Sequence, residues 1–221
     1  MKLRIVLLLL PLVLLSSLAP ASAQTKYTTD VSAGLMFPTG SFGTFFKTGL
    51  AVNLSFSMAG GDGIRYHLGL GYDRATLDNK ALNDDPNANS NGGQFDVGGA
   101  VSAFPILLGV KFISSSPGTR PYGVLEGGIY LYSKKFDGGT YTYPDGTIIT
   151  ASSSSSFKVE PGVSLGAGVM FPLDAGKALD VAVRYHMVKN SQYTDLPNDA
   201  YVGFSQFFSL TVGLSFGIIP S

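Results

Sequence analysis

The sequence has no cysteine, and only 14% of its 221 residues carry a charge. Without cysteine the chain forms no disulfides and has no thiol chemistry. Soluble domains are typically about 25% charged, so this chain has few charges for a water-facing surface. Fifteen basic residues balance fifteen acidic ones, so there is no positive excess to attract nucleic acid. These absences exclude a disulfide scaffold, a thiol enzyme and a nucleic-acid-binding protein.

Long hydrophobic runs are also missing, apart from one of 11 residues at positions 5–15. A membrane-spanning helix needs about 20 apolar residues, so this run is too short to be an anchor. Two basic residues precede it and Ala21-Ser22-Ala23 follows it, which is the pattern of a secretory signal peptide. No cysteine follows the run, so a lipoprotein is excluded. We predict that residues 1–23 are cleaved off, leaving 24–221 as one domain with a net charge near −2.

What the chain does have is strict alternation, clearest near its end. From Phe208 to Ile218 every even position is large and apolar, and every odd position from Ser209 to Gly217 is Ser, Thr or Gly. Period-two alternation predicts a β-strand with one apolar face and one small, polar face. The mean hydropathy of the chain is +0.24. An exported, apolar chain without membrane helices indicates a membrane β-barrel.

Eight segments alternate in this way. They are residues 27–37, 50–58, 64–73, 95–112, 121–133, 157–171, 179–188 and 207–218. Gly98-Gly99 suggests a bulge in the fourth segment, so the facing of residues 95–103 stays open. Pro105 and Pro161 fall inside predicted strands, where a backbone N–H is wanted. We predict an all-β fold, an eight-stranded antiparallel up-and-down transmembrane β-barrel whose last strand pairs with its first, because hydrocarbon tolerates no open sheet edge.

The connections between the segments alternate in length. The long ones are residues 38–49, 74–94, 134–156 and 189–206, and the short ones are 59–63, 114–120 and 172–178. An up-and-down barrel with this pattern carries long loops at one rim and tight turns at the other, as outer-membrane barrels do. The long connections are rich in Asn, Asp, Ser and Gly and are predicted to be solvated and mobile, with Ser152 to Ser156 as a flexible linker.

Alternation does not say whether the apolar face points outward or inward, as it would in a soluble lipocalin-like barrel. The other face is rich in Gly, Ala, Ser and Thr, whereas a water-facing surface would carry many more Lys and Glu. Aromatic residues also gather towards both ends of the apolar face, as they do in the belts at membrane interfaces. They are Tyr27, Phe56, Tyr66, Phe112, Phe171 and Phe216 at the turn rim, and Phe37, Tyr72, Phe157 and Tyr185 at the loop rim. We therefore predict that the apolar face meets lipid.

The polar face then lines the interior, where opposite charges should pair because an isolated buried charge is costly. An eight-stranded barrel is only just wide enough for its own side chains to fill. We therefore predict a plugged interior without an open pore. The predicted interior polar network comprises Asp30, Arg65, His67, Asp73, Lys111, Glu126, Lys158, Glu160, Asp180, Arg184 and His186.

The chain resembles the small outer-membrane β-barrel family of the OmpA/OmpX type over essentially its whole mature length. The resemblance is carried by residues 34–42 (GLMFPTGSF), 68–72 (LGLGY), 104–112 (FPILLGVKF), Pro121-Tyr122-Gly123 and the closing strand. It implies insertion by the barrel-assembly machinery, with both termini in the periplasm. Many family members end on an aromatic residue, whereas this chain continues past Phe216 to Ser221. The resemblance does not imply a peptidoglycan-binding role, because no such domain follows the barrel.

Some eight-stranded barrels are enzymes, and lipid A 3-O-deacylases use a His, a Ser and a Glu near the loop end. Arg184-Tyr185-His186 loosely resembles the strand that carries their histidine, but Val188 stands where the Ser is wanted. Ser191 falls in a loop, and no Glu follows Glu160. A hydrolytic triad needs its nucleophile within hydrogen-bond reach of its base, so this spacing favours an interior role for His186.

Asp84-Asp85 lacks the spacing of a calcium-binding loop, and no nucleotide or zinc motif is present. We therefore expect no catalytic, cofactor or metal site. The predicted function is a structural or surface-interaction role in the outer membrane of a Gram-negative bacterium. The expected partners are outer-membrane lipid, lipopolysaccharide and an extracellular ligand of the long loops, and the barrel itself is expected to be monomeric. A lipid-modifying enzyme and a narrow channel are the alternatives.

Overall fold

The computed structural model describes residues 27–86, 89–116, 118–174, 176–189 and 204–218. The predicted signal peptide, residues 1–23, and Ser191 lie outside the described residues. No helix within the described ranges is long and apolar enough to cross a membrane.

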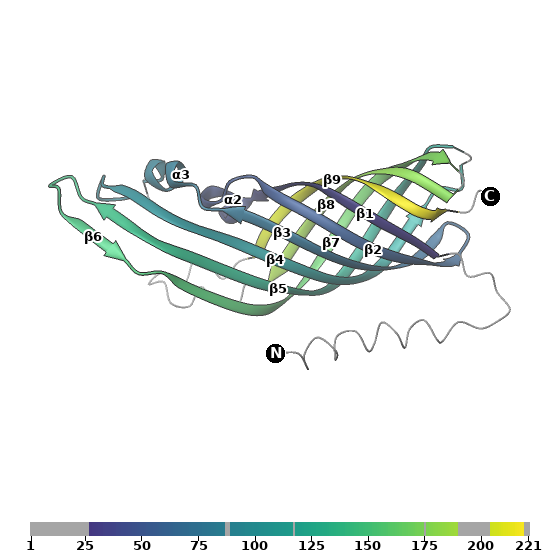
Figure 1. Cartoon of the computed structure of the whole chain (residues 1–221), viewed down its shortest axis with the longest axis horizontal. Coiled ribbons are helices and arrows are strands. Elements are labelled where there is room, and N and C mark those ends of the chain that lie inside the picture. The colour runs from purple at the N-terminus through teal and green to yellow at the C-terminus, as the bar shows by residue number, and fades with distance from the viewer. Residues whose placement is uncertain (1–26, 87–88, 117, 175, 190–203, 219–221) are drawn as a thin grey trace.

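The described chain consists almost entirely of antiparallel strands (Figure 1). The elements are β1 (Tyr27–Thr39), α2 (Gly40–Phe45), β2 (Gly49–Gly61), β3 (Ile64–Thr76), α3 (Asn79–Asp84), β4 (Gln94–Ile113), β5 (Arg120–Thr142), β6 (Ile148–Ala151), β7 (Ser154–Asp174), β8 (Gly176–Lys189) and β9 (Phe204–Ile218). The sheet order is β4-β3-β2-β1-β9-β8-β7-β5, and an additional β4–β5 pairing closes it. The short β6 is attached outside this ring. The predicted closed eight-stranded barrel is confirmed.

The first and last strands form the seam of the barrel, as the sequence predicts. They pair antiparallel in continuous register from Thr29 opposite Phe216 to Thr39 opposite Gln206. Short connections join β2 to β3, β4 to β5 and β7 to β8 at the end where β1 begins and β9 ends, which we call the turn end (right in Figure 1). The opposite end, the loop end, carries α2, α3 and β6.

The apolar positions of the alternating segments lie on the outside of the barrel. Leu108 is 67% exposed and Leu165 is 62% exposed, whereas their sequence neighbours Leu107 and Ser164 are buried. Aromatic side chains meet at the loop end of this outer surface. The rings of Tyr72 and Phe104 are 4.7 Å apart. The outward apolar face that the alternation predicts is therefore confirmed.

The irregularity predicted at Gly98-Gly99 is present, but its extra residue belongs to the neighbouring strand. Gly98 pairs with Gly138 and Gly99 pairs with Phe136, so Asp137 of β5 has no partner in β4. β4 therefore keeps its own alternation through the bulge. This settles the facing of residues 95–103, where odd positions lie on the side of the barrel axis. Val101 and Ala103, for example, are buried inside the barrel.

Both prolines lie within strands, and Pro105 marks a break in a ladder. β3 and β4 pair up to Leu70 opposite Ile106 and resume at Asp73 opposite Ala103, with no pairing described between these two points. Proline has no N–H to donate to a neighbouring strand, which accounts for the gap. Pro161 stands opposite Ile129 in the uninterrupted β5–β7 ladder. The barrel therefore tolerates each proline locally.

The prediction of a mobile loop at residues 134–156 is wrong. β4 and β5 run beyond the barrel, and β5 pairs with β6 from Gly139 opposite Ala151 to Thr142 opposite Ile148. Ser154 to Ser156, predicted as flexible linker, pair with β5 as the start of β7. We call the three-stranded sheet of residues 94–98 and 138–151 the extension, and Figure 1 shows it reaching past the barrel at the loop end.

A tight turn closes the tip of the extension. The Gly146 N–H donates to the Tyr143 carbonyl over 2.9 Å, and Gly146 has a φ of 87°, which favours glycine. The Thr147 N–H donates to the Asp145 carboxylate over 2.9 Å and lowers the pKa of this exposed group. The turn residues Pro144, Asp145 and Gly146 therefore fix the hairpin that joins β5 to β6.

The predicted loop at residues 74–94 contains helix α3, which covers one edge of the extension. The Asp78 side chain caps this helix by accepting the Lys80 N–H over 3.0 Å. Asn79 accepts the Val97 N–H over 3.1 Å, and Asn83 both accepts from and donates to the backbone of Phe95. Two asparagines one helical turn apart thus replace a neighbouring strand.

Candidate functional site

The candidate site is the barrel interior, which holds many of the ionisable residues of the strands. Alternation places these side chains inward, and the register between strands decides which of them meet. The polar side chains form three groups along the barrel axis, one near the turn end, one in the middle and one towards the loop end.

The group nearest the turn end is centred on Lys111, which is 1% exposed. Its ammonium lies 3.2 Å from a carboxylate oxygen of Asp30 and 3.8 Å from one of Asp180. It also lies 4.2 Å from the centre of the Tyr122 ring, whose hydroxyl donates to Asp180 over 2.8 Å. One cation of β4 therefore reaches across the interior and holds two carboxylates, from β1 and β8, which are separated only by β9.

Asp30 accepts further hydrogen bonds from the two strands next to its own. Ser55 of β2 donates to it over 2.9 Å, and Ser215 of β9 donates to its other oxygen. Arg65 is only half-buried, and its guanidinium lies 3.4 Å from the Thr28 hydroxyl near the turn end. Arg65 is thus inward-facing, at the edge of the network.

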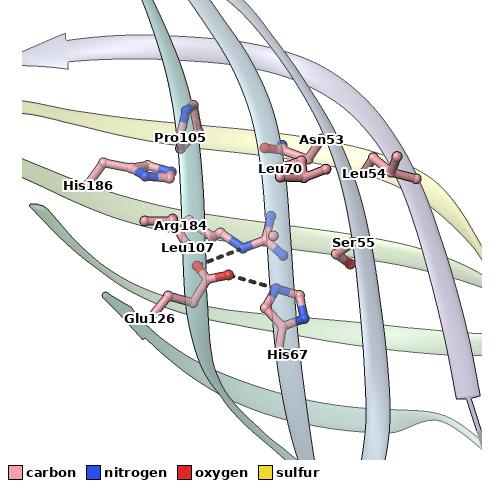
Figure 2. A pocket seen from close by; sticks show the side chains of 11 residues that line it. Asn53, Leu54, Ser55, His67, Leu70, Pro105, Leu107, Glu126, Arg184 and His186 are labelled. Carbon is pink, nitrogen blue, oxygen red and sulfur yellow. Dashed lines mark ion pairs between the residues drawn. The ribbon is translucent and has the colours of Figure 1, made fainter. Parts of the chain in front are cut away.

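The middle group joins Glu126, His67 and Arg184 (Figure 2). One Glu126 carboxylate oxygen lies 2.7 Å from His67 Nε2, and the other lies 3.8 Å from Arg184 Nε. The Ser57 hydroxyl lies 3.2 Å from His67 Nδ1. All four side chains are buried, so this carboxylate bridges two strands far apart in the sequence.

The third group surrounds His186, which is buried and stacks on Phe207 with ring centres 4.5 Å apart. Its Nδ1 lies 2.9 Å from the Tyr130 hydroxyl, and its Nε2 lies 3.2 Å from the Ser209 hydroxyl. Sequence spacing alone does not indicate the contact with Ser209. It follows from the β8–β9 register, which sets Arg184 opposite Ser209 and so brings His186 beside it.

Three further predicted residues lie inside the barrel. Asp73 is 1% exposed, and neither carboxylate oxygen has a hydrogen-bond partner within the described part of the chain. Glu160 is buried and Lys158 is half-buried, and they share one face of β7 opposite Tyr130 and Tyr132. The loop half of the interior also contains an apolar cluster, with Phe42 of α2 packed into it.

The space left between these side chains is small. A cavity of about 10 Å³ lies among residues that include His67, Glu126, Arg184 and His186, and Figure 2 shows these side chains converging on it. A single water molecule needs roughly this volume, so the cavity holds no larger ligand.

Among solved structures, the chain is similar to Neisserial surface protein A, with a TM-score of 0.50 and 14% identity over 87% of this chain and 97% of that one. The chain has the fold of the small outer-membrane β-barrels. The barrel also matches OprG from Pseudomonas aeruginosa, with a TM-score of 0.48 and 13% identity over 88% of this chain and 97% of that one. OmpT, an outer-membrane protease from Escherichia coli, matches with a TM-score of 0.46 and 11% identity over 89% and 98%.

No family model matches the chain. No curated protein matches it either. The similarity therefore establishes the fold of the barrel, and the chemistry of its interior has to be judged from its own residues.

Ser209 and His186 offer the barrel a hydroxyl beside a base, the arrangement that activates a serine nucleophile. Two features disfavour catalysis there. The third partner, on Nδ1, is the Tyr130 hydroxyl, whereas a triad orients its histidine with a carboxylate. Both Ser209 and His186 are also buried, and the cavity that His186 lines is too small for a substrate. The geometry favours a structural hydrogen-bond network.

Among the described residues, no group of three or more His, Asp or Glu side chains is arranged to hold a metal ion. The carboxylates that approach one another, Asp30 and Asp180, already share the ammonium of Lys111. The negative charge of this carboxylate pair is therefore partly neutralised by a lysine of the barrel itself.

Proposed function

We propose that this protein is a non-catalytic barrel of the Gram-negative outer membrane, exported through residues 1–23, with a closed interior and a surface-interaction role at its loop end. The observation that carries the proposal is the filled interior. Lys111 of β4 reaches across the interior to Asp30 of β1 and Asp180 of β8. Glu126 and Tyr130 of β5 reach past β7 to Arg184 and His186 of β8. An open water path along the axis would have to displace all three.

The loop end supports the interaction role. The extension is a sheet that projects from the barrel, and all four residues of β6 are exposed. Asn79 and Asn83 of α3 brace its other edge, so the projection is held in one position. A rigid projecting sheet presents a defined surface to the cell exterior, which a mobile loop does not.

Conductance tests the closed interior. The purified barrel, reconstituted in a planar bilayer, is expected to show no large, steady current, because the interior ion pairs leave room for about one water molecule. Heat-modifiable migration in a detergent gel confirms that the inserted protein is folded. A stable open channel formed by the folded protein would contradict the proposal.

Removal of the extension tests the surface role. Deletion of residues 139–151 is expected to lower the adhesion of expressing bacteria to a serum-coated surface to that of cells without the protein. The deletion is conservative for the barrel, because Gly138 lies beside Ser152 and Ser153 in the folded chain. Heat-modifiable migration should be retained. The matched control is a shortened tip that lacks only Pro144 and Asp145, and unchanged adhesion after the full deletion would refute the role.

A further inference from the structure

The outer surface of the barrel changes character within a few residues at the loop end. On β4 the outward side chains pass from Leu108 and Phe104 to Ser102, and on the neighbouring β5 they pass from Ile129 to Ser133. The apolar band therefore ends at one level on both strands. In a membrane barrel this is the level at which acyl chains give way to polar headgroups.

Two cations stand at this boundary on the strands next to β4. Arg74 of β3 lies opposite Ser102 of β4 and opposite Leu50 of β2, and directly opposed residues share a face, so Arg74 points outward. Lys135 of β5 lies opposite Ala100 and is 67% exposed along its side chain. Neighbouring strands are about 4.8 Å apart, so these two cations flank β4 at a lateral separation of about 10 Å.

Small and hydroxyl-bearing side chains fill the space between the two cations. Ser102 lies opposite Ser133, and the Tyr72 hydroxyl lies 3.4 Å from the Ser102 hydroxyl. Tyr72 also interacts with Arg74 through its hydroxyl. Below this group the ring of Tyr72 packs against Phe104. We call Tyr72, Arg74, Ser102, Ser133 and Lys135 the rim patch. It combines two cations and three hydroxyl groups, above the packed rings of Tyr72 and Phe104.

We propose that the rim patch binds a phosphate group of lipid A in the outer leaflet. Arg74 has no acidic partner within the described ranges, and its guanidinium presents the fork of donors that matches a phosphate. The hydroxyls supply additional hydrogen-bond donors, and the outward apolar side chains below the patch would contact the acyl chains of the same lipid. This inference rests on the proposed location in the outer membrane and names a ligand for its surface.

One acidic side chain opposes the ligand. Asp137, the extra residue of the β5 bulge, is 50% exposed and lies 2.6 Å from the Lys135 ammonium. A bound phosphate must share Lys135 with this carboxylate. Removal of the Asp137 charge should therefore strengthen binding, which is the opposite of the effect expected for the two cations.

The test is titration of the purified barrel in detergent with lipid A that carries both phosphates and with the same lipid A after dephosphorylation, followed by native mass spectrometry. The wild-type protein should prefer the phosphorylated lipid. Each of Arg74→Gln and Lys135→Gln should weaken its binding by about fivefold, and Asp137→Asn should strengthen it, because one cation near a membrane surface contributes about that factor. Binding of the dephosphorylated lipid should not change.

Lys189→Gln is the matched control, because Lys189 is an exposed cation on β8 at the same end, away from the patch. It should leave the affinity unchanged. The proposal would be overturned if the protein bound the phosphorylated and the dephosphorylated lipid A equally well, or if Lys189→Gln weakened binding as much as Arg74→Gln does. It would also be overturned if inorganic phosphate displaced lipid A at concentrations equal to those of the lipid. Each variant is also isolated from an outer-membrane fraction and checked for heat-modifiable migration. If the proposed location were wrong, the protein would be missing from that fraction, so this result is distinguishable from a failure of lipid binding.

Discussion

Lys111→Met is expected to lower the free energy of unfolding of the barrel by about 3–5 kcal/mol, the usual cost of removing one partner from a buried ionic group. Methionine fills much of the same volume but leaves Asp30 and Asp180 without the ammonium that separates them. Both carboxylates are buried, so water does not replace the lost partner. The measurement is the urea dependence of the folded band in a detergent gel.

The control for this variant is Lys177→Met, because Lys177 is an exposed lysine at the turn end of β8. It should change stability by less than about 0.5 kcal/mol, as surface substitutions usually do. The triple variant Lys111→Met, Asp30→Asn, Asp180→Asn should recover part of the loss, because it removes the unpaired charges. If Lys111→Met alone were as stable as Lys177→Met, the interior network would not hold the barrel together.

Gly34→Ala is expected to prevent most of the protein from reaching the folded, heat-modifiable form. Gly34 lies in the seam opposite Thr211, and a Cβ atom there would collide with the Leu210 carbonyl oxygen and lie 2.7 Å from the Thr211 Cα. Backbone atoms of a paired strand have little freedom to move, so the cost should reach or exceed the roughly 1–3 kcal/mol of ordinary overpacking. The fraction of folded protein after refolding into detergent gives the result.

Gly127→Ala provides the comparison at another strand glycine. A Cβ atom at Gly127 would lie no closer than 4.0 Å to its nearest neighbours, the Gly162 carbonyl oxygen and a Val163 methyl group. This variant should fold like the wild type. Similar folded fractions for Gly34→Ala and Gly127→Ala would mean that the seam has more tolerance than its geometry indicates.

The alternation of the sequence was sufficient to predict the barrel because its apolar and polar faces obey a single rule over many residues. The eight strands, the outward apolar face and the β1–β9 seam all follow from it. The rule ends where the outer surface turns polar. In the extension, the residues on the side of the barrel axis are aromatic, such as Phe95 and Tyr141, while Asp96 faces outward. A search for apolar-out strands therefore misreads the extension as a loop.

The interior groups show a second limit of the sequence. Alternation places His186 and Glu126 inward, but only the strand register determines that one meets Ser209 and the other meets His67. The same limit applies to Asp73, which alternation places inside like Asp30, although it has no hydrogen-bond partner in the described ranges. Inward facing is a property of one strand, whereas pairing is a property of several.

The hydrogen bond from Ser215 to Asp30 has a kinetic consequence, because it joins residues 185 positions apart and forms only when the ring closes. A contact this distant in sequence is among the last to form, so one oxygen of Asp30 lacks its Ser215 donor until β9 pairs, whereas Ser55 and Lys111 contact the other oxygen. The neighbours of Ser215 on the same face are Gly213 and Gly217, which have no side-chain donor. If the seam slipped by two residues, a glycine would stand opposite Asp30 and this hydrogen bond would be lost. The Ser215 hydroxyl therefore favours the native register when the barrel closes.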